Sequence, residues 1–462
     1  MNKPMVRIKG SYLVRPCEAT WVGTMALSEW DQIDCLTHVP VIFFYRPANT
    51  WLSPPSAIAD TLKHSLSRAL VPFYPLAGRL QWIGNGRLQL QCNAMGAQFI
   101  EAECDSSLDE LCDSSLSFQP NSLFPSIDYS LPIHEIPVCF AQLIKFKCGG
   151  IGIALAFSHA VVDGPAAIHM VYEWARLARG EPLQTPPFLD RSVFRAGQPP
   201  LTSPPPSLDD YPEYKNPPLL LGQMDNSEER KKKTTMAMLR ITKSQVEQLR
   251  KMANDNKPIM ARGFTRFETI CGYIWRIACK ARGLKKKQPT VSAISVDSRN
   301  CMRPQLPREY FGNANFNVTA QSVVGDLTSK PLGFAASKVR EAIEKVTSEY
   351  VRSSIELLKN QKDLTKFQDI NKEEGAFYGN PNIEIVSWLT LPLYGFDFGW
   401  GKEQYMGLGS HGTEGNFVLL PGIEGDGSVI VAMCLQEAHM NAFKKHFYGD
   451  IISTTIGLRA AL

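Results

Sequence analysis

The stretch that decides the fold is IGIALAFSHAVVDGPAAIHMVYEWARLARG, residues 151–180. It opens with an apolar run behind two glycines, which predicts a buried strand ending near His159. Proline is readily accommodated in the first turn of a helix, so Pro165 marks the start of a helix predicted over residues 165–179. A buried strand that leads directly into a helix indicates an α/β protein and places His159 at the junction.

The same alternation of strand and helix signals continues on both sides of this stretch. Short β-branched or aromatic runs predict strands, and apolar residues three or four positions apart predict helices. The strands expected are residues 39–45, 291–296 and 427–434, and the helices expected are residues 56–70, 267–280 and 438–447.

A proline-rich stretch over residues 182–218 divides the chain into two halves. Proline fixes the backbone and lacks an N–H group, so this stretch cannot continue a helix or a central strand. We therefore expect an N-terminal domain over residues 1–185, a proline-rich and charged crossover over 186–234, and a C-terminal domain over 235–462.

The composition excludes several classes of function. The 49 Lys and Arg residues nearly balance the 45 Asp and Glu residues, for a net charge of +4, so the chain lacks the basic surface of a nucleic-acid-binding protein. The N-terminus has no apolar signal segment, and no stretch reaches the about 18 apolar residues of a membrane span. The 11 cysteines form no CxxC pair. We expect a cytoplasmic, soluble protein that binds neither nucleic acid nor membrane.

His159 and Asp163 are the residues with the clearest chemical potential. A histidine side chain can accept a proton at neutral pH and return it, as a general base must. Asp163, four residues on, could orient the imidazole or tie the loop to a distant arginine. On spacing alone, a core histidine hydrogen-bonded to the backbone stays an open alternative. The other seven histidines show no zinc-ligand spacing, so no metal site is expected.

The segment FDFGWG, residues 396–401, combines aromatic residues, glycines and one acid. This composition favours a tight structural corner over a catalytic loop, because Asp397 is its one titratable group.

Two motifs together resemble the signature of the plant BAHD acyltransferases: HAVVDG at residues 159–164 and DFGWG at residues 397–401. The likeness covers almost the whole chain, through LSEWD at 27–31, YPLAGR at 74–79, YFGN at 310–313 and VSWL at 386–389. The resemblance implies a two-domain chloramphenicol-acetyltransferase-like fold, with mixed sheets flanked by helices and a channel at the domain interface. It also implies a coenzyme A thioester as co-substrate and no further cofactor. We also expect a monomer.

The resemblance also implies roles for the matching residues. His159 would be the general base, and the indole N–H of Trp388 would stabilise the oxyanion of the tetrahedral intermediate. Asp163 belongs to the same catalytic motif, but it would point away from the substrate and form an architectural ion pair with Arg299. The structural-motif residues are Arg299, Asp397, Gly399, Trp400 and Gly401, of which Asp397 and Trp400 would shape the channel floor.

Within the family, the chain most resembles the spermidine hydroxycinnamoyl transferases, through stretches such as KFKCGG at 145–150 and EWARLARGEP at 173–182. This resemblance implies hydroxycinnamoyl-coenzyme A as donor and spermidine as acceptor. Relatives that esterify shikimate hold its carboxylate with an arginine shortly before the VSWL strand, where this chain has Glu373-Glu374. An acidic channel mouth favours a polycation. The residues expected to bind the acceptor are His38, Glu373 and Glu374.

The phosphates of coenzyme A need positive charge at the other mouth of the channel, and Thr265, Arg266 and Lys285 are expected to bind them. Two further functions stay open. One is an O-acyltransferase that acts on shikimate, quinate or another alcohol, and the other is a non-catalytic small-molecule binder with the same fold.

Overall fold

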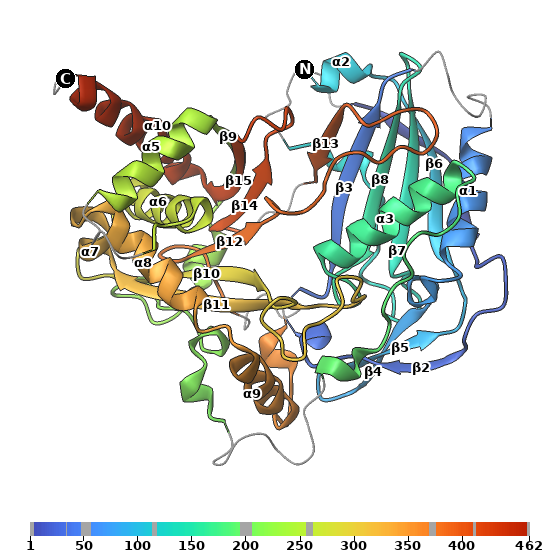
Figure 1. Cartoon of the computed structure of the whole chain (residues 1–462), viewed down its shortest axis with the longest axis horizontal. Coiled ribbons are helices and arrows are strands. Elements are labelled where there is room, and N and C mark those ends of the chain that lie inside the picture. Colours follow the sequence, from blue (N-terminus) through green and yellow to red (C-terminus); the bar gives the residue numbers. More distant parts are fainter. Residues whose placement is uncertain are drawn as a thin grey trace.

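The structure, a computed structural model, describes residues 4–33, 35–47, 57–112, 118–194, 206–255, 262–368, 376–409 and 413–459. Two sheet-rich parts lie side by side, one built mainly from the first half of the chain and one from the second (Figure 1). Helices pack on both sheets, so the predicted two-domain, mixed α/β architecture is confirmed.

The first part contains a six-stranded sheet in which the β6–β7 pair is parallel and the other neighbours are antiparallel. In spatial order its strands are β1 (Val6–Val14), β6 (Ala97–Cys104), β7 (Cys139–Phe146), β8 (Ile151–Ser158), β3 (His38–Tyr45) and β13 (Tyr405–Leu408). Strands β3 and β8 lie where the sequence predicts them. Their pairing sets His38 opposite Ser158, the residue before His159.

Two helices, α1 (Ile58–Ala69) and α3 (Gly164–Ala178), pack together against this sheet (Figure 1). The indole N–H of Trp174 on α3 donates to Ser65 Oγ on α1 over 2.9 Å. This part also contains a short helix, α2 (Leu108–Cys112), and a three-stranded sheet in the order β2 (Gly23–Ala26), β5 (Arg87–Cys92) and β4 (Arg79–Gly84). Helix α3 confirms the helix predicted from the deciding stretch and fixes the orientation of the residues just before it.

The second part contains another six-stranded sheet, flanked by most of the remaining helices (Figure 1). In spatial order its strands are β11 (Asn315–Val323), β10 (Pro289–Asp297), β12 (Ile383–Ser387), β14 (Asn416–Pro421), β15 (Val429–Gln436) and β9 (Thr234–Ile241). The helices are α4 (Ser227–Lys231), α5 (Lys243–Asn254), α6 (Arg266–Ala281), α7 (Val324–Ser329), α8 (Leu332–Ile343), α9 (Ser348–Lys359) and α10 (Glu437–Arg459). None of the helices described here is long and apolar enough to cross a bilayer.

One strand of the second half, β13, belongs to the first sheet. It pairs antiparallel with β3, with Tyr405 opposite Phe44 and Leu408 opposite Val41, and the rings of Phe44 and Tyr405 stack 5.9 Å apart. Phe396 and Phe398, shortly before β13, are buried in the same core as α1 and α3. The second half of the chain therefore contributes to both cores, and the predicted domain limits at residues 185 and 235 stay a prediction.

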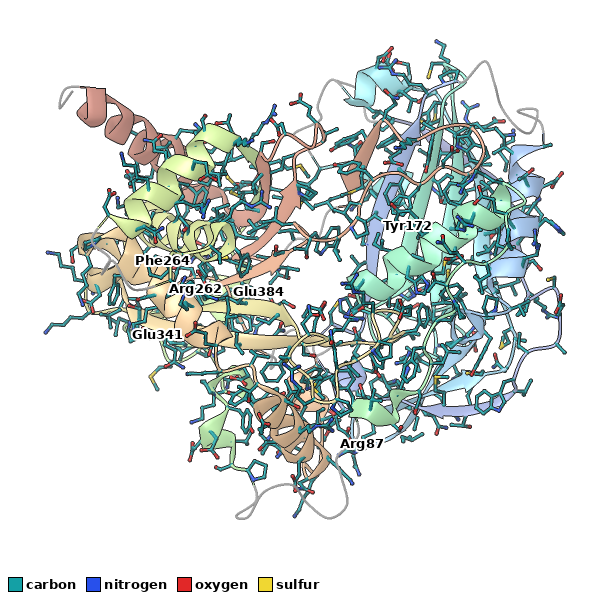
Figure 2. All side chains as sticks on the ribbon, in the orientation of Figure 1. Arg87, Tyr172, Arg262, Phe264, Glu341 and Glu384 are labelled. Atoms are coloured by element: carbon teal, nitrogen blue, oxygen red, sulfur yellow. The ribbon has the colours of Figure 1, made fainter. Side chains whose placement is uncertain are left out.

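A second link between the halves runs through Arg87 of β5, whose side chain reaches the C-terminal end of α9 (Figure 2). Its guanidinium donates to the carbonyl oxygens of Lys359 and Gln361, both over 3.0 Å. Cations are favourable at the negative end of a helix dipole, so this contact holds the small sheet against the second part.

Candidate active site

Strand β8 carries the chain from the core to His159. All eight residues of β8 are buried, and the backbone N–H of His159 donates to the carbonyl of Thr37 over 2.9 Å. The imidazole itself is half-buried, and no hydrogen bond joins it to any residue that the structure describes. Among the described residues the ring thus has no backbone partner of the kind that a core histidine would have, and its role as general base stays a prediction.

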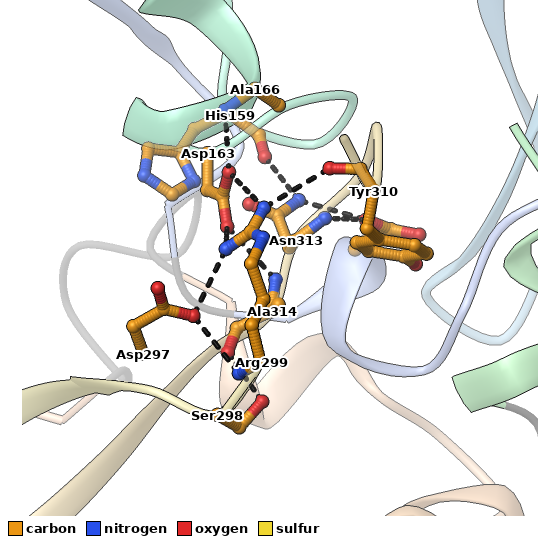
Figure 3. Close-up of polar contacts among 10 residues, drawn as sticks. His159, Asp163, Ala166, Asp297, Ser298, Arg299, Tyr310, Asn313 and Ala314 are labelled. Atoms are coloured by element: carbon orange, nitrogen blue, oxygen red, sulfur yellow. Dashed lines mark hydrogen bonds and ion pairs between the residues drawn. The ribbon is translucent and has the colours of Figure 1, made fainter. Parts of the chain in front are cut away.

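The turn after His159 ends in a buried ion pair between Asp163 and Arg299 (Figure 3). The pair is bidentate, with Nη1 and Nη2 of Arg299 each 2.8 Å from an oxygen of Asp163. Asp163 also caps α3 by accepting from the N–H of Ala166 over 3.1 Å, and it accepts from the N–H of Ala314 over 3.0 Å. The predicted contact with Arg299 is present, and none of these four hydrogen bonds of the carboxylate involves His159.

Arg299 lies just beyond β10 and has further acceptors besides Asp163. Its Nη1 is 3.1 Å from Asp297 Oδ1, and its Nη2 donates to the carbonyl of Tyr310 over 3.2 Å. Burial by itself lowers the pKa of the Arg299 guanidinium, but the carboxylates of Asp163 and Asp297 outweigh it and raise that pKa. The Arg299 guanidinium therefore stays charged, and its contact with Asp163 links the two halves of the chain.

A second contact from the YFGN segment reaches the carbonyl of His159. The amide Nδ2 of Asn313 donates to that oxygen over 2.7 Å and to Asp31 Oδ1 over 2.9 Å (Figure 3). Sequence reasoning gave no role to Asn313 or Asp31. Their only signal was that both lie in segments that resemble the family, and nothing in the spacing brings residues 282 positions apart together.

Trp388 follows directly after β12 and is half-buried. Its backbone N–H donates to the carbonyl of Leu419 over 2.8 Å. Three residues on, the side chain of Leu391 lies against Gly164, where a Cβ atom would come within 3.0 Å of Leu391 Cδ1. The segment that begins at Trp388 therefore contacts the first turn of α3, next to the HAVVDG motif, and its role as an oxyanion donor stays a prediction.

The DFGWG segment is a closed turn around Asp397. One oxygen of Asp397 accepts from the backbone N–H groups of Gly399, Trp400 and Gly401 at 2.8, 3.1 and 2.9 Å. Both glycines have positive φ, 112° and 96°, a region that other residues rarely adopt. The Trp400 ring is buried and lies edge-on to Tyr45, 6.1 Å away. The Asp397 carboxylate is thus hydrogen-bonded to the backbone of its own turn, as expected for a structural corner.

Of the three residues expected to bind the acceptor, only His38 lies among the described residues. His38 Nδ1 lies 3.0 Å from the hydroxyl of Tyr129, and Nε2 lies 2.9 Å from the carbonyl of Pro137. Burial lowers the pKa of His38 to about 4, so the ring is neutral. Both nitrogens have protein partners, which an acceptor would have to displace. Glu373 and Glu374 lie outside the described residues.

The three residues expected to bind coenzyme A are not all brought together. Thr265 caps α6 by accepting from the N–H of Glu268, and Arg266 lies in the first turn, with Nη1 3.5 Å from the carbonyl of Gly427. Lys285 is exposed beyond the other end of α6. A helix of 16 residues spans about 24 Å at 1.5 Å per residue. One phosphate group therefore cannot contact Arg266 and Lys285 together.

In the ranges that the structure describes, no group of three or more His, Cys, Asp or Glu side chains is placed to hold an ion. The chemistry available at the site is that of an accessible imidazole on a turn held by Asn313 and by the Asp163–Arg299 pair.

Comparison with known proteins gives three kinds of match. A model of the Transferase family matches residues 4–450. The chain is 44% identical to hydroxycinnamoyl-CoA:piscidic acid hydroxycinnamoyltransferase of Actaea racemosa, over 97% of this chain and 100% of that protein. It is 35% identical to shikimate O-hydroxycinnamoyltransferase of Nicotiana tabacum, over 96% and 99% of the two chains. It is 33% identical to hydroxycinnamoyl-CoA:5-hydroxyanthranilate N-hydroxycinnamoyltransferase of Avena sativa, also over 96% and 99%.

The fold is similar to that of vinorine synthase, whose crystal structure matches with a TM-score of 0.71 and 22% identity, over 96% of this chain and 98% of that one. The predicted fold class is thereby confirmed, while the channel at the domain interface stays a prediction. Family members use a coenzyme A thioester as co-substrate and need no cofactor. The match over nearly the whole length, together with both motifs, shows that the chain belongs to the BAHD acyltransferase family.

Proposed function

We propose that this protein transfers a hydroxycinnamoyl group from its coenzyme A thioester to an amine of spermidine, with His159 as general base. The observation that carries the proposal is the accessible imidazole of His159, which lies on a turn fastened at its carbonyl by Asn313. A base held by its backbone and free at its ring can meet a substrate in one orientation.

The reaction is a direct transfer between two bound substrates. The acceptor nitrogen attacks the thioester carbonyl carbon, and His159 takes the proton that the nitrogen loses. The oxyanion that forms accepts a hydrogen bond from the Trp388 indole N–H. When the intermediate collapses, the C–S bond breaks and the imidazolium returns its proton to the coenzyme A sulfur. The products are the amide and the free thiol, with no acyl-enzyme.

Amine chemistry adds a requirement that an alcohol does not. A free alkylammonium has a pKa near 10, so the reacting nitrogen must lose one proton before attack and a second during it. Desolvation in an apolar site lowers the pKa of the ammonium and supplies the neutral amine. The other ammonium groups of spermidine stay charged and would be attracted by the carboxylates of Glu373 and Glu374.

Two observations support a nitrogen acceptor. The chain carries an acidic pair, Glu373-Glu374, at about the place where the family resemblance implies a carboxylate-binding arginine in relatives that esterify shikimate. A relative of 33% identity is named as an N-hydroxycinnamoyltransferase, so transfer to nitrogen occurs on this scaffold.

A hydroxy acid is the second candidate acceptor. The relatives of 44% and 35% identity are named for transfer to piscidic acid and shikimate. For a carboxylate, Glu373 and Glu374 would be repulsive, and another cation would have to hold it.

The decisive assay supplies p-coumaroyl-, caffeoyl- or feruloyl-coenzyme A with spermidine, piscidic acid or shikimate, and follows thiol release and product mass. Thiol release with spermidine as the only productive acceptor supports amide formation. Thiol release with only one of the acids supports the second candidate function, transfer to a hydroxy acid. No release with any acceptor favours the non-catalytic binder. His159→Ala is expected to lower kcat by about 10²–10⁴-fold.

The acidic pair is tested with the double variant Glu373→Gln, Glu374→Gln. The KM for spermidine is expected to rise while the KM for the acyl thioester stays constant, because only the acceptor is a polycation. The matched control is Glu341→Gln, Glu344→Gln, which removes the same charge from exposed residues at and just beyond the end of α8, with Glu341 labelled on the outer side of the second part (Figure 2). An equal KM for spermidine in both double variants would contradict steering by the acidic pair.

A further inference from the structure

A second buried ion pair lies behind the turn of His159, between Asp31 and Arg191. Arg191 Nη1 is 2.7 Å from Asp31 Oδ2, and the side chains are 1% and 0% exposed. Asp31 belongs to a 3-10 helix over Trp30–Gln32, and Arg191 begins another over Arg191–Phe194, close after the first half of the chain. Burial by itself lowers the pKa of Arg191, but the carboxylate of Asp31 and other neighbouring groups reverse this and raise it. The guanidinium of Arg191 therefore stays charged beside Asp31.

Each member of this ion pair is connected by hydrogen bonds to a backbone carbonyl of the turn that contains His159. The other arm of Arg191, Nη2, donates to the carbonyl of Val161 over 2.7 Å. The other oxygen of Asp31 accepts from Asn313, through the backbone N–H over 3.0 Å and through Nδ2 over 2.9 Å. Asn313 Nδ2 also donates to the carbonyl of His159 over 2.7 Å. One carboxylate thus connects two donors that hold the peptide planes of His159 and Val161.

We propose that Asp31 and Arg191 are positioning residues for His159. The inference rests on the proposed function of His159 as general base. Because the imidazole has no hydrogen bond within the described parts of the chain, its direction is set by the backbone of the turn. The carbonyls of His159 and Val161 accept hydrogen bonds from Asn313 and Arg191. Both donors also contact Asp31, so two of the three peptide planes over residues 159–161 are fixed through this carboxylate. A shift of the carboxylate or the guanidinium therefore reorients the bond from Cα to Cβ of His159.

The alternative is that the pair only stabilises the fold. A buried ion pair is weak support for stability, since desolvation of both charges offsets much of their attraction. The structure contains a matched pair for this comparison. Arg282 Nη2 lies 2.6 Å from Glu414 Oε1, with exposures of 1% and 2%, and Arg282 Nη1 donates to the carbonyl of Asn382 over 2.8 Å. This pair has the same chemistry and burial, but its carbonyl belongs to the second sheet part and not to the turn of His159.

The test compares Arg191→Lys with Arg282→Lys in the full-length protein. Lysine keeps the charge and loses the second arm, so each variant frees one carbonyl. Both variants are expected to melt at a lower temperature. Only Arg191→Lys is expected to lower kcat, by about 10–100-fold, as a displacement near 1 Å does, with the KM of the acyl thioester unchanged. Arg191→Lys combined with Asn313→Ala should cost less than the product of the two single effects, since both act on one turn.

A second measurement does not depend on turnover. The rate at which diethyl pyrocarbonate modifies His159, followed by mass spectrometry of the peptide, should change in Arg191→Lys and not in Arg282→Lys. If the wild type transfers no acyl group, the proposed function fails, yet this rate still decides the positioning of the ring.

Several results would overturn the proposal. Equal losses of kcat in the two lysine variants, or an unchanged kcat and modification rate in Arg191→Lys, would show that the pair does not position the base. Asp31→Asn, which keeps the shape of the side chain and removes its charge, repeats the test if Arg191→Lys does not fold. If neither variant folds, the pair serves the fold and the positioning role is refuted.

Discussion

Replacing Asp163 with asparagine would leave the guanidinium of Arg299 buried without its main counter-charge. The carboxylate accepts four hydrogen bonds, two from Arg299 at 2.8 Å and one each from the N–H groups of Ala314 and Ala166 at 3.0 and 3.1 Å. An asparagine offers one oxygen in place of two and turns an N–H₂ group toward one of these donors. The variant therefore loses both the negative charge beside Arg299 and part of the hydrogen-bond geometry around it.

The size of the effect follows from these contacts. Removing one partner of a buried ion pair costs about 3–5 kcal/mol of the free energy of unfolding. Arg299 keeps Asp297, 3.1 Å away with its side chain 40% exposed, so we expect the lower end, about 3 kcal/mol. At about 2–4 °C per kcal/mol for a large domain, the melting temperature should fall by about 6–12 °C.

The assay is thermal unfolding at pH 7, paired with steady-state turnover. Asp326→Asn serves as control, because it breaks a surface pair with Lys330 whose side chains are 41% and 46% exposed, and such pairs contribute about 0–1 kcal/mol. Asp163→Asn should melt well below both the wild type and this control. If instead it melted like the wild type and lost turnover to the same extent as His159→Ala, Asp163 would take part in the chemistry and the architectural reading would be refuted.

Two further predictions concern an oxyanion donor and a buried acid. Trp388→Phe keeps an aromatic ring but loses the indole N–H, so kcat should fall by about 10²–10³-fold with little change in melting temperature, and an unchanged kcat would remove Trp388 from the mechanism. Burial raises the pKa of Glu213 to about 7, above that of the unfolded chain. Its contribution to stability is therefore complete below about pH 4.5 and is lost as the pH rises through 7. Glu213→Gln should melt like the wild type at pH 4.5 and above it at pH 8, and an equal difference at both pH values in melting scans would contradict this.

The local elements of the fold could be predicted because their signals are local. Strand β8 and helix α3 follow from one continuous stretch, and α6 contains the predicted helix over residues 267–280. Helix α10 runs to Arg459, well beyond the predicted end at residue 447. Tyr448-Gly449-Asp450 interrupts the apolar spacing, but Asp450 forms an ion pair with Lys280 of α6, a tertiary contact that no local pattern contains.

The candidate site could be predicted only in part. His159 was located by its place at the end of a predicted strand. The pairing of Asp163 with Arg299 was predicted from family resemblance alone, because the two residues lie 136 positions apart and no local pattern connects them. The roles of Asp31 and Arg191 could not be predicted, because a buried charge has no distinctive spacing from a partner on another segment. The separation of Lys285 from Arg266, by contrast, already follows from the helix predicted over residues 267–280, which the structure confirms as α6.

The placement of β13 at the edge of the first sheet limits how this protein can be recombined with its relatives. An exchange at the proline-rich crossover would inherit β3 from one parent and β13 from the other. The hybrid then has to match Tyr405 to Phe44 across a join that neither parent optimised. Productive hybrids should therefore come from three-segment exchanges, in which residues 391–408 travel with the first half.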